Sequence, residues 1–190
     1  FKKVQSEFNS KPLFKNLDVL ITAGPTQEPI DPIRFISNKS SGIQGYMLAK
    51  ELVGLGAKVS LISGPTNLEI PNNLTNFIKV RTADEMYNAC LKKIPKDLFI
   101  SVAAVTDWKT KVNANKIKKT NNPLNIKLIN NPDILETISC HKNRPRLVVG
   151  FAAETNKLEE NALKKIKQKR CDVIIANDVS KNNYVLGGSE

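Results

Sequence analysis

A group of small residues, Ser40, Ser41, Gly42 and Gly45, stands just before an expected helix. The first N–H groups of a helix have no partner within the helix, and the helix dipole favours a phosphate or carboxylate there. The turn therefore indicates an anion site. It lacks the full G-x-G-x-x-G pattern of dinucleotide-binding turns, and its two glycines would equally allow a helix to pack closely on a sheet.

Charged residues elsewhere would suit a phosphorylated ligand. Asp107 follows a buried run and either holds Mg²⁺ on a triphosphate or caps a turn. The run from Lys116 to Lys119 either contacts phosphates or forms a solvated loop. Lys165 and Lys169 share one face of an expected helix and can reach one anion, although two solvated lysines explain the spacing equally well.

The chain offers little material for nucleophilic catalysis. His141 is the only histidine, and Cys90, Cys140 and Cys171 are widely spaced, with no Cys-x-x-Cys pair. This argues against a Ser-His-Asp triad and against a histidine-rich metal site. A reaction here would depend on binding, orientation and electrostatic stabilisation of phosphate charge.

The elements that must position these residues follow from an alternation of apolar, β-branched runs with helical patterns. Thr82 and Glu85 have the spacing of a capping box at one helix start. The alternation predicts an α/β fold: a Rossmann-like, doubly wound, mostly parallel sheet with helices on both faces. We expect strands at 17–24, 57–65, 76–81, 97–105, 124–128, 146–151 and 172–176, and helices beginning near 46, 83, 131 and 157.

Ligands of such sheets bind outside the carboxyl ends of the strands. Small or polar residues follow most of the expected strands at that edge. They include Arg34 and Asn38 after the first strand, Asp107 and Lys116 after the fourth, and Ala153 after the strand at 146–151. We therefore expect one site on this edge.

Composition narrows the class of protein. The chain has 190 residues, 41% of them hydrophobic, which suffices for one domain with a core. Its net charge of +11 favours anionic partners, but only 6% of residues are aromatic and no basic strand carries interleaved aromatics, which disfavours a nucleic-acid-binding module. No apolar run approaches the ~20 residues that span a bilayer. Unpaired cysteines and no visible secretion signal lead us to expect a cytoplasmic protein.

Seven segments taken together resemble the phosphopantothenoylcysteine synthetase family, the ligase half of the bacterial bifunctional coenzyme A biosynthesis protein. They cover most of residues 17–179. The resemblance implies a Rossmann-like fold and a homodimer. The segments are ITAGPTQEPIDPIRFISNKSSGIQG, LISGPT, SVAAVTDW, NKIKK, NNPDIL, VGFAAET and IIANDV.

The resemblance also implies a reaction, a CTP-dependent ligation with Mg²⁺. 4′-Phosphopantothenate would attack the α-phosphate of CTP to form an acyl-cytidylate. The amine of L-cysteine would then give 4′-phosphopantothenoylcysteine, and CMP and pyrophosphate would be the other products. The KIKK and NNPDIL segments resemble the CTP-using bacterial type rather than the ATP-using eukaryotic type.

Site residues follow by the same resemblance. Lys116 would stabilise triphosphate charge and the attack by cysteine, and Asp107 would either contact cytidine or hold the metal. Asn38, with Arg34 beside it, would form or hold the acyl-nucleotide. Ser40, Ser41, Gly42 and Ala153 would bind the anionic substrate. The nucleotide would lie among Ala103, Ala104, Val105, Asp107, Lys116, Asn131, Pro132, Asp133, Ile134, Phe151, Lys165 and Lys169.

The resemblance sets the expected domain organisation. Residues 1–16 would be a linker or the trailing segment of a missing N-terminal decarboxylase domain, which in the family holds FMN. Residues 17–190 would be the synthetase domain, truncated at its C-terminus relative to the family. A decarboxylase, fused or associated, is therefore an expected partner.

The competing interpretation of the chain as a short dehydrogenase is disfavoured, because Tyr46 and Lys50 have the Tyr-x-x-x-Lys spacing of such enzymes only inside the first helix.

Overall fold

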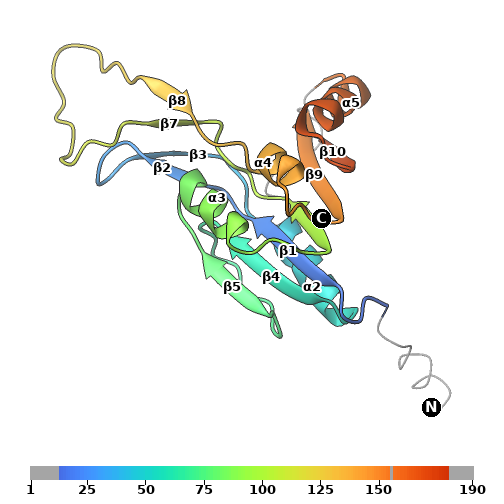
Figure 1. Ribbon diagram of the computed structural model, residues 1–190. Helices are drawn as coiled ribbons and strands as arrows, with labels where there is room; N and C mark the ends of the chain where they lie inside the picture. Colours follow the sequence, from blue (N-terminus) through green and yellow to red (C-terminus); the bar gives the residue numbers. More distant parts are fainter. Residues whose placement is uncertain (1–12, 155, 180–190) are drawn as a thin grey trace.

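The central element is a six-stranded parallel sheet with strand order β5-β4-β1-β6-β9-β10. The computed structural model of the chain describes residues 13–154 and 156–179 (Figure 1). The order is that of a doubly wound sheet, with its switch point between β1 and β6, and it confirms the expected fold class. The strands are β1 (Asp18–Ala23), β4 (Lys58–Ser63), β5 (Asn76–Lys79), β6 (Leu98–Ser101), β9 (Leu147–Glu154) and β10 (Val173–Asp178).

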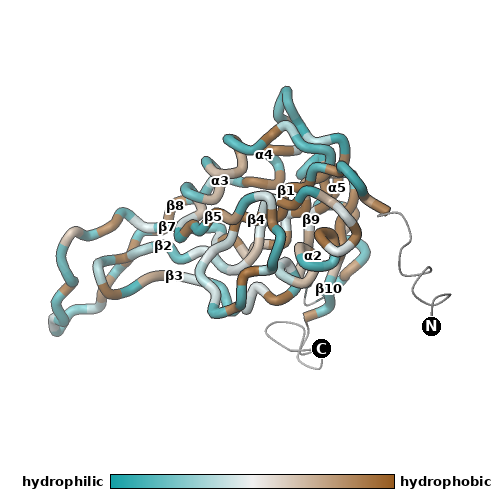
Figure 2. Tube along the Cα trace, turned by 90° about the horizontal axis from the view of Figure 1, so that it is seen from below, coloured by the Kyte–Doolittle hydropathy of each residue, from teal (hydrophilic) through white to brown (hydrophobic). Residues whose placement is uncertain are grey.

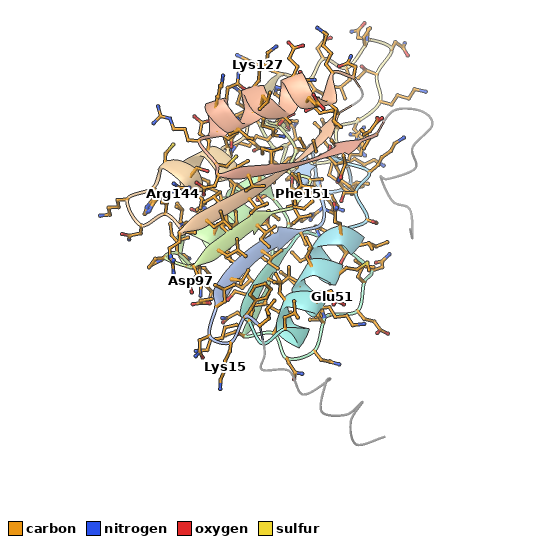
Figure 3. The ribbon with its side chains drawn as sticks, turned by 90° about the vertical axis from the view of Figure 1, so that its right-hand side faces the viewer. Lys15, Glu51, Asp97, Lys127, Arg144 and Phe151 are labelled. Atoms are coloured by element: carbon orange, nitrogen blue, oxygen red, sulfur yellow. The ribbon has the colours of Figure 1, made fainter. Side chains whose placement is uncertain are left out.

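Helices cover both faces of this sheet because successive strand residues point to opposite sides. Leu20, Ile62 and Phe99 lie in the core beneath α3 and α4, to which Ile166 of α5 adds. Val19 and Leu61 face the other way and pack with residues of α2. Figure 3 shows this helix, which carries Glu51, against the sheet. The helices are α2 (Ile43–Gly54), α3 (Ala83–Leu91), α4 (Ile134–Cys140) and α5 (Leu158–Lys169).

Short antiparallel strands form an arm that projects from the sheet, where the sequence had suggested loops. We define the arm as residues 27–37 and 108–130. It contains β2 (Gln27–Pro29) paired with β3 (Phe35–Ser37), and β7 (Trp108–Thr110) paired with β8 (Leu128–Asn130). Figure 2 shows apolar residues concentrated in the body of the molecule and a largely hydrophilic tip on the arm.

The expected strand at 124–128 is wrong, because pairing begins only at Leu128. The alternating pattern that suggested it lies in an exposed segment, with Leu124 and Ile126 both exposed. Alternation predicts a strand only where one side is covered by a core. The arm strands themselves have three residues each, too few to show a period.

Residues 1–12 of the expected linker, and residues 180–190 of the expected synthetase domain, lie outside the described residues. None of the helices in the described part of the chain has the length and apolar character needed to cross a membrane.

Gly64, which follows β4, offers a direct test of how closely its loop packs on the loop that follows β1. A Cβ at Gly64 would lie 1.8 Å from the carbonyl oxygen of Pro25, whereas a Cβ at Gly54 would meet nothing within 4 Å. We expect Gly64→Ala to lower the free energy of unfolding by about 3 kcal/mol, because backbone must move. The control Gly54→Ala should be neutral or stabilise by up to about 1 kcal/mol. Equal urea midpoints for the two variants would contradict this.

Candidate active site

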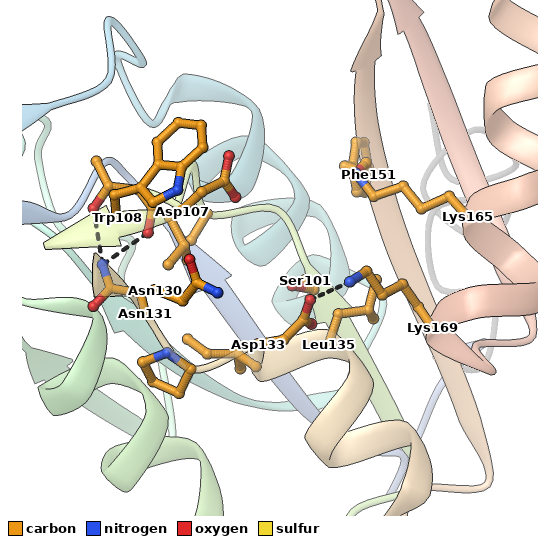
Figure 4. A pocket seen from close by; sticks show the side chains of 15 residues that line it. Ser101, Asp107, Trp108, Asn130, Asn131, Asp133, Leu135, Phe151, Lys165 and Lys169 are labelled. Carbon is orange, nitrogen blue, oxygen red and sulfur yellow. Dashed lines mark hydrogen bonds and ion pairs between the residues drawn. The ribbon is translucent and has the colours of Figure 1, made fainter. Parts of the chain in front are cut away.

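Two adjoining cavities open at the carboxyl edge of the sheet, beside the switch point between β1 and β6. Figure 4 shows the residues that line the first of them. The first cavity has a volume of about 530 Å³ and the second about 610 Å³. Because they share lining residues, two ligands could lie in contact across the boundary. The shared residues are Ala103, Val105, Asp107, Phe151 and Lys165.

The first cavity is built between the loop after β6 and the start of α4. Asp133 caps α4 by accepting from the backbone N–H of Glu136 at 2.9 Å. The backbone N–H of Asn131 donates to the carbonyl of Asp107 at 2.8 Å, and its side-chain Nδ2 donates to the carbonyl of Thr106 at 2.8 Å. Asn131 Oδ1 is buried and accepts no hydrogen bond from the described residues.

Two lysines of α5 reach this cavity (Figure 4). Lys165 Nζ donates to the carbonyl of Phe151 at 3.2 Å. Lys169 Nζ pairs with the carboxylate of Asp133 and lies 3.5 Å from that of Glu136. Burial lowers the pKa of Lys169, but its hydrogen bond and charge interaction with Asp133, together with Glu136, outweigh burial and raise that pKa. Lys169 is therefore a cation held in place at the cavity wall.

The second cavity lies at the start of α2. Gly42 caps this helix at φ 82°, without a side-chain hydrogen bond, and a Cβ there would lie 2.7 Å from Thr66 Cγ2. Asn38 Nδ2 donates to the carbonyl of Ala104 at 2.9 Å. A Cβ at Gly45 would lie 2.5 Å from that of Ala23, so close packing explains this glycine. Gly42 and Gly45 both combine the two interpretations of the turn, since each packs closely and also lines the cavity.

Most of the residues expected at the site come together in these cavities. The exceptions are Arg34 and Lys116, which lie on the arm and line neither cavity. The first cavity is lined by Ala103, Val105, Asp107, Asn131, Pro132, Asp133, Ile134, Phe151, Lys165 and Lys169. The second is lined by Asn38, Ser40, Ser41, Gly42, Ala103, Ala104, Val105, Asp107, Phe151, Ala153 and Lys165.

A buried polar network beneath the first cavity was not foreseen from the sequence. Thr106 shares a hydrogen bond of 2.9 Å with Thr26 through their hydroxyls, and its hydroxyl donates to Glu28 at 3.2 Å. Glu28 also accepts from the N–H of Ala83 at 2.8 Å. The network fixes the segment that carries Asp107, and Asn131 is attached to it through Nδ2, which donates to the carbonyl of Thr106. Thr106 could have been suspected from the sequence, because it stands between Val105 and Asp107, which were expected at the site. Glu28 could not, because in the sequence it looks like an ordinary solvated acid.

The residues present fit a metal ion carried by a substrate. No group of three or more histidine, cysteine or acidic residues in the described ranges could hold a metal. Mg²⁺ on a nucleoside triphosphate needs only one or two carboxylates, because phosphate oxygens and waters supply its other ligands. Asp107, exposed and lining both cavities, meets that need.

The dehydrogenase interpretation finds no support in the position of Tyr46. Its ring is buried, and its hydroxyl donates to Ser63 at 3.0 Å and accepts from Thr66 at 3.1 Å. A hydroxyl engaged in this way braces the turn beside the second cavity. It does not line either of the two cavities.

A doubly wound sheet with a two-part cavity at its switch point defines an α/β protein whose candidate ligand site lies at the carboxyl edge of the sheet. Within that class the chain belongs to the family described as DNA/pantothenate metabolism flavoprotein, C-terminal domain, which matches residues 14–190. The expected family resemblance is thereby confirmed.

Curated relatives are named coenzyme A biosynthesis bifunctional protein CoaBC. The protein from Borreliella burgdorferi is 47% identical over 182 residues, which cover 94% of this chain and 46% of the relative. The protein from Escherichia coli K12 is 44% identical over 171 residues, covering 87% of this chain and 42% of the relative. The chain thus spans less than half the length of these relatives.

Solved structures show the same fold. The crystal structure of the C-terminal domain of CoaBC has a TM-score of 0.77 at 41% identity, covering 90% of this chain and 81% of that chain. The Cab2 H337A variant in complex with phosphopantothenate-cysteine has a TM-score of 0.72 at 17% identity, covering 95% of this chain and 81% of that one. The second likeness concerns the fold alone.

Proposed function

We propose that this chain is a phosphopantothenate–cysteine ligase that uses CTP. It would join 4′-phosphopantothenate to L-cysteine in coenzyme A biosynthesis, with CMP and pyrophosphate as the other products. The observation that carries this is the pair of adjoining cavities, one with two lysines at its wall, the other at a helix start. Identity of 47% to a CoaBC protein supports the same conclusion.

The proposed chemistry has two steps. A carboxylate oxygen of 4′-phosphopantothenate, in the second cavity, bonds to the α-phosphorus of CTP in the first cavity, and pyrophosphate leaves with the electrons of the broken P–O bond. The cysteine amine then bonds to the acyl carbon and loses a proton, and CMP leaves. No enzyme nucleophile is needed, so the protein contributes orientation and charge stabilisation.

Individual residues receive roles in this proposal. Lys165 and Lys169 hold the phosphate chain, and Mg²⁺ bound on the triphosphate with help from Asp107 neutralises further charge. Asn131 lines the first cavity and holds the segment of Thr106 and Asp107 in place through its two hydrogen bonds. Asn38 donates to the acyl-nucleotide, with Arg34 and Lys116 completing the charge stabilisation from the arm.

We further propose that the chain works as a homodimer in the cytoplasm, fused to or associated with a phosphopantothenoylcysteine decarboxylase. FMN would belong to that decarboxylase. Exposed large apolar side chains on the arm support self-association, since such groups favour burial against a partner. They include Ile33, Phe35, Leu124, Leu128 and Ile129.

Product formation tests the proposed function. The chain, incubated with Mg²⁺, 4′-phosphopantothenate, L-cysteine and CTP, should release CMP and pyrophosphate in equal amounts with 4′-phosphopantothenoylcysteine. Each omission should stop the reaction, except that omission of cysteine should still allow a first turnover that releases pyrophosphate. CTP hydrolysis without the ligated product would contradict the proposal.

A further inference from the structure

Asp31, at the turn between β2 and β3, is an enclosed carboxylate with an unusual number of donors. Its side chain has no exposed surface. Oδ1 accepts from the backbone N–H groups of Ile33 and Arg34, both at 2.9 Å. Oδ2 accepts from Arg34 Nε at 3.0 Å and pairs with the Arg34 Nη2 group as well. The Arg34 guanidinium thereby holds the pKa of the Asp31 carboxyl well below its usual range, so Asp31 remains ionised at any working pH.

The same ion pair forms hydrogen bonds with the backbone of Ile117, more than 80 residues further along the chain. Asp31 Oδ2 accepts from the backbone N–H of Ile117 at 3.2 Å, and Arg34 Nη2 donates to the carbonyl oxygen of Ile117 at 3.0 Å. Both polar groups of Ile117 are therefore bound by one Asp–Arg pair. The N–H of Asn113, which donates to the carbonyl of Ile30 at 2.9 Å, adds a third tie between the same two segments.

These two hydrogen bonds to Ile117 are the main contacts that hold a long exposed segment in place. Residues 111–127 contain no helix or strand, and almost all of their side chains are exposed. Ile117 is the half-buried exception, and Lys116 directly precedes it. Fixing both peptide groups of Ile117 fixes where the backbone of Lys116 lies, and it also sets the spacing between Lys116 and Arg34.

We infer that Asp31 is a positioning residue, which holds Arg34 and the Lys116 segment in one fixed unit so that both cations are presented together to the substrate phosphates. The inference rests on the proposed function for the roles of Arg34 and Lys116. Asp31 itself, being enclosed, touches no substrate. A plain structural role is the alternative, in which the pair only stabilises the turn of the β2–β3 hairpin.

Asp31→Asn tests the inference, because it keeps the shape and removes the charge. We expect kcat of ligation to fall about 100-fold, since a displaced charged group costs this much when geometry is lost. The KM for CTP should change less than about fivefold, because the residues of the first cavity are untouched. Amide exchange of Ile117, followed by NMR, should accelerate at least about tenfold, while amides of β1 keep their protection.

Asp172→Asn is the matched control. Asp172 also pairs with an arginine, Arg144, at 2.6 Å, and also accepts a backbone N–H, from Val148 at 2.7 Å, but at the opposite end of the sheet. The Asp172→Asn variant should leave both kcat and the amide exchange rate of Ile117 unchanged. In the double variant Asp31→Asn with Lys116→Gln, the loss in kcat should be clearly smaller than the product of the two single losses, because both changes disable Lys116.

The outcomes separate this inference from the proposed function. Normal kcat in Asp31→Asn, or a loss with unchanged Ile117 exchange, overturns the positioning role. Additive losses in the double variant do the same. If the unaltered chain makes no ligated product, the proposed function fails, and the Ile117 exchange rates still decide whether Asp31 holds the segment.

Discussion

Lys116→Gln is expected to reduce the rate of product formation by about 1000-fold while the protein stays folded. A cation placed against charge that develops on a transferred phosphoryl group contributes mainly in the transition state, and removing one such group costs about 10²–10³ in kcat. Lys116 is exposed on the arm, so its loss should change the free energy of unfolding by less than about 0.5 kcal/mol. The measurement is steady-state ligation together with thermal unfolding of the same sample.

Lys127→Gln is the matched control for this prediction. It removes the same charge from the same exposed segment of the arm. If general attraction between a basic arm and an anionic substrate explained the effect, the two variants would lose activity alike and raising the salt concentration would mimic them. A loss confined to Lys116 supports a specific role. Equal losses would refute it.

Asn38→Asp should impair the chemistry much more than the binding of CTP. Asn38 Nδ2 donates to the carbonyl of Ala104 at 2.9 Å, whereas an aspartate has no hydrogen to donate and repels both that oxygen and a bound acyl-nucleotide. We expect product formation to fall about 100-fold or more. The dissociation constant for CTP should stay within about threefold, because Asn38 does not line the first cavity.

Rapid-quench assays with labelled CTP would report the acyl-cytidylate, pyrophosphate and final product separately for Asn38→Asp. Asn143→Asp, an exposed change at the amino edge of the sheet, controls for the added charge. Normal product at a normal rate in Asn38→Asp would show that the assignment of Asn38 is wrong.

The central sheet could be predicted from the sequence because its strands are buried on both faces. Continuous apolar runs such as that of β1, five of whose six residues are buried, leave little ambiguity. The start of α3 could also be predicted, because it depends only on side chains close together in the sequence. The predicted capping box is present at α3, where the Thr82 hydroxyl accepts from Glu85 N–H at 3.2 Å.

The arm could not be predicted, because its structure depends on contacts between distant segments. Its strands have three residues each, and β7 pairs with β8 across 17 residues without regular structure. Nothing in the local pattern around Asp31 reveals that it meets Ile117. Polar residues in a run such as EPIDPIR look solvated in a sequence, and only the fold shows that Asp31 is enclosed while Arg34 is not.

The position of the site at the carboxyl edge of the sheet was predictable, but which residues line the cavities and which lie on the arm was not. In a parallel sheet the carboxyl ends of all strands lie on one edge, so the side chains after β1, β6 and β9 were expected to share that edge. Which of them would line a cavity depends on the loops. The loop after β6 turns at once into the first cavity through Asp107, whereas Lys116, nine residues further on, lies out on the arm.

Calorimetric and thermal-shift titration with CTP, ATP and NAD, each with Mg²⁺, is the most direct test of the proposal that the first cavity holds a cytidine triphosphate. We expect CTP to bind and to raise the melting temperature by several degrees at about 100 times its dissociation constant, where binding adds about 2.7 kcal/mol. ATP and NAD should give little shift. A larger shift with NAD, or none with CTP, would contradict the assignment of this edge to a CTP-dependent ligase.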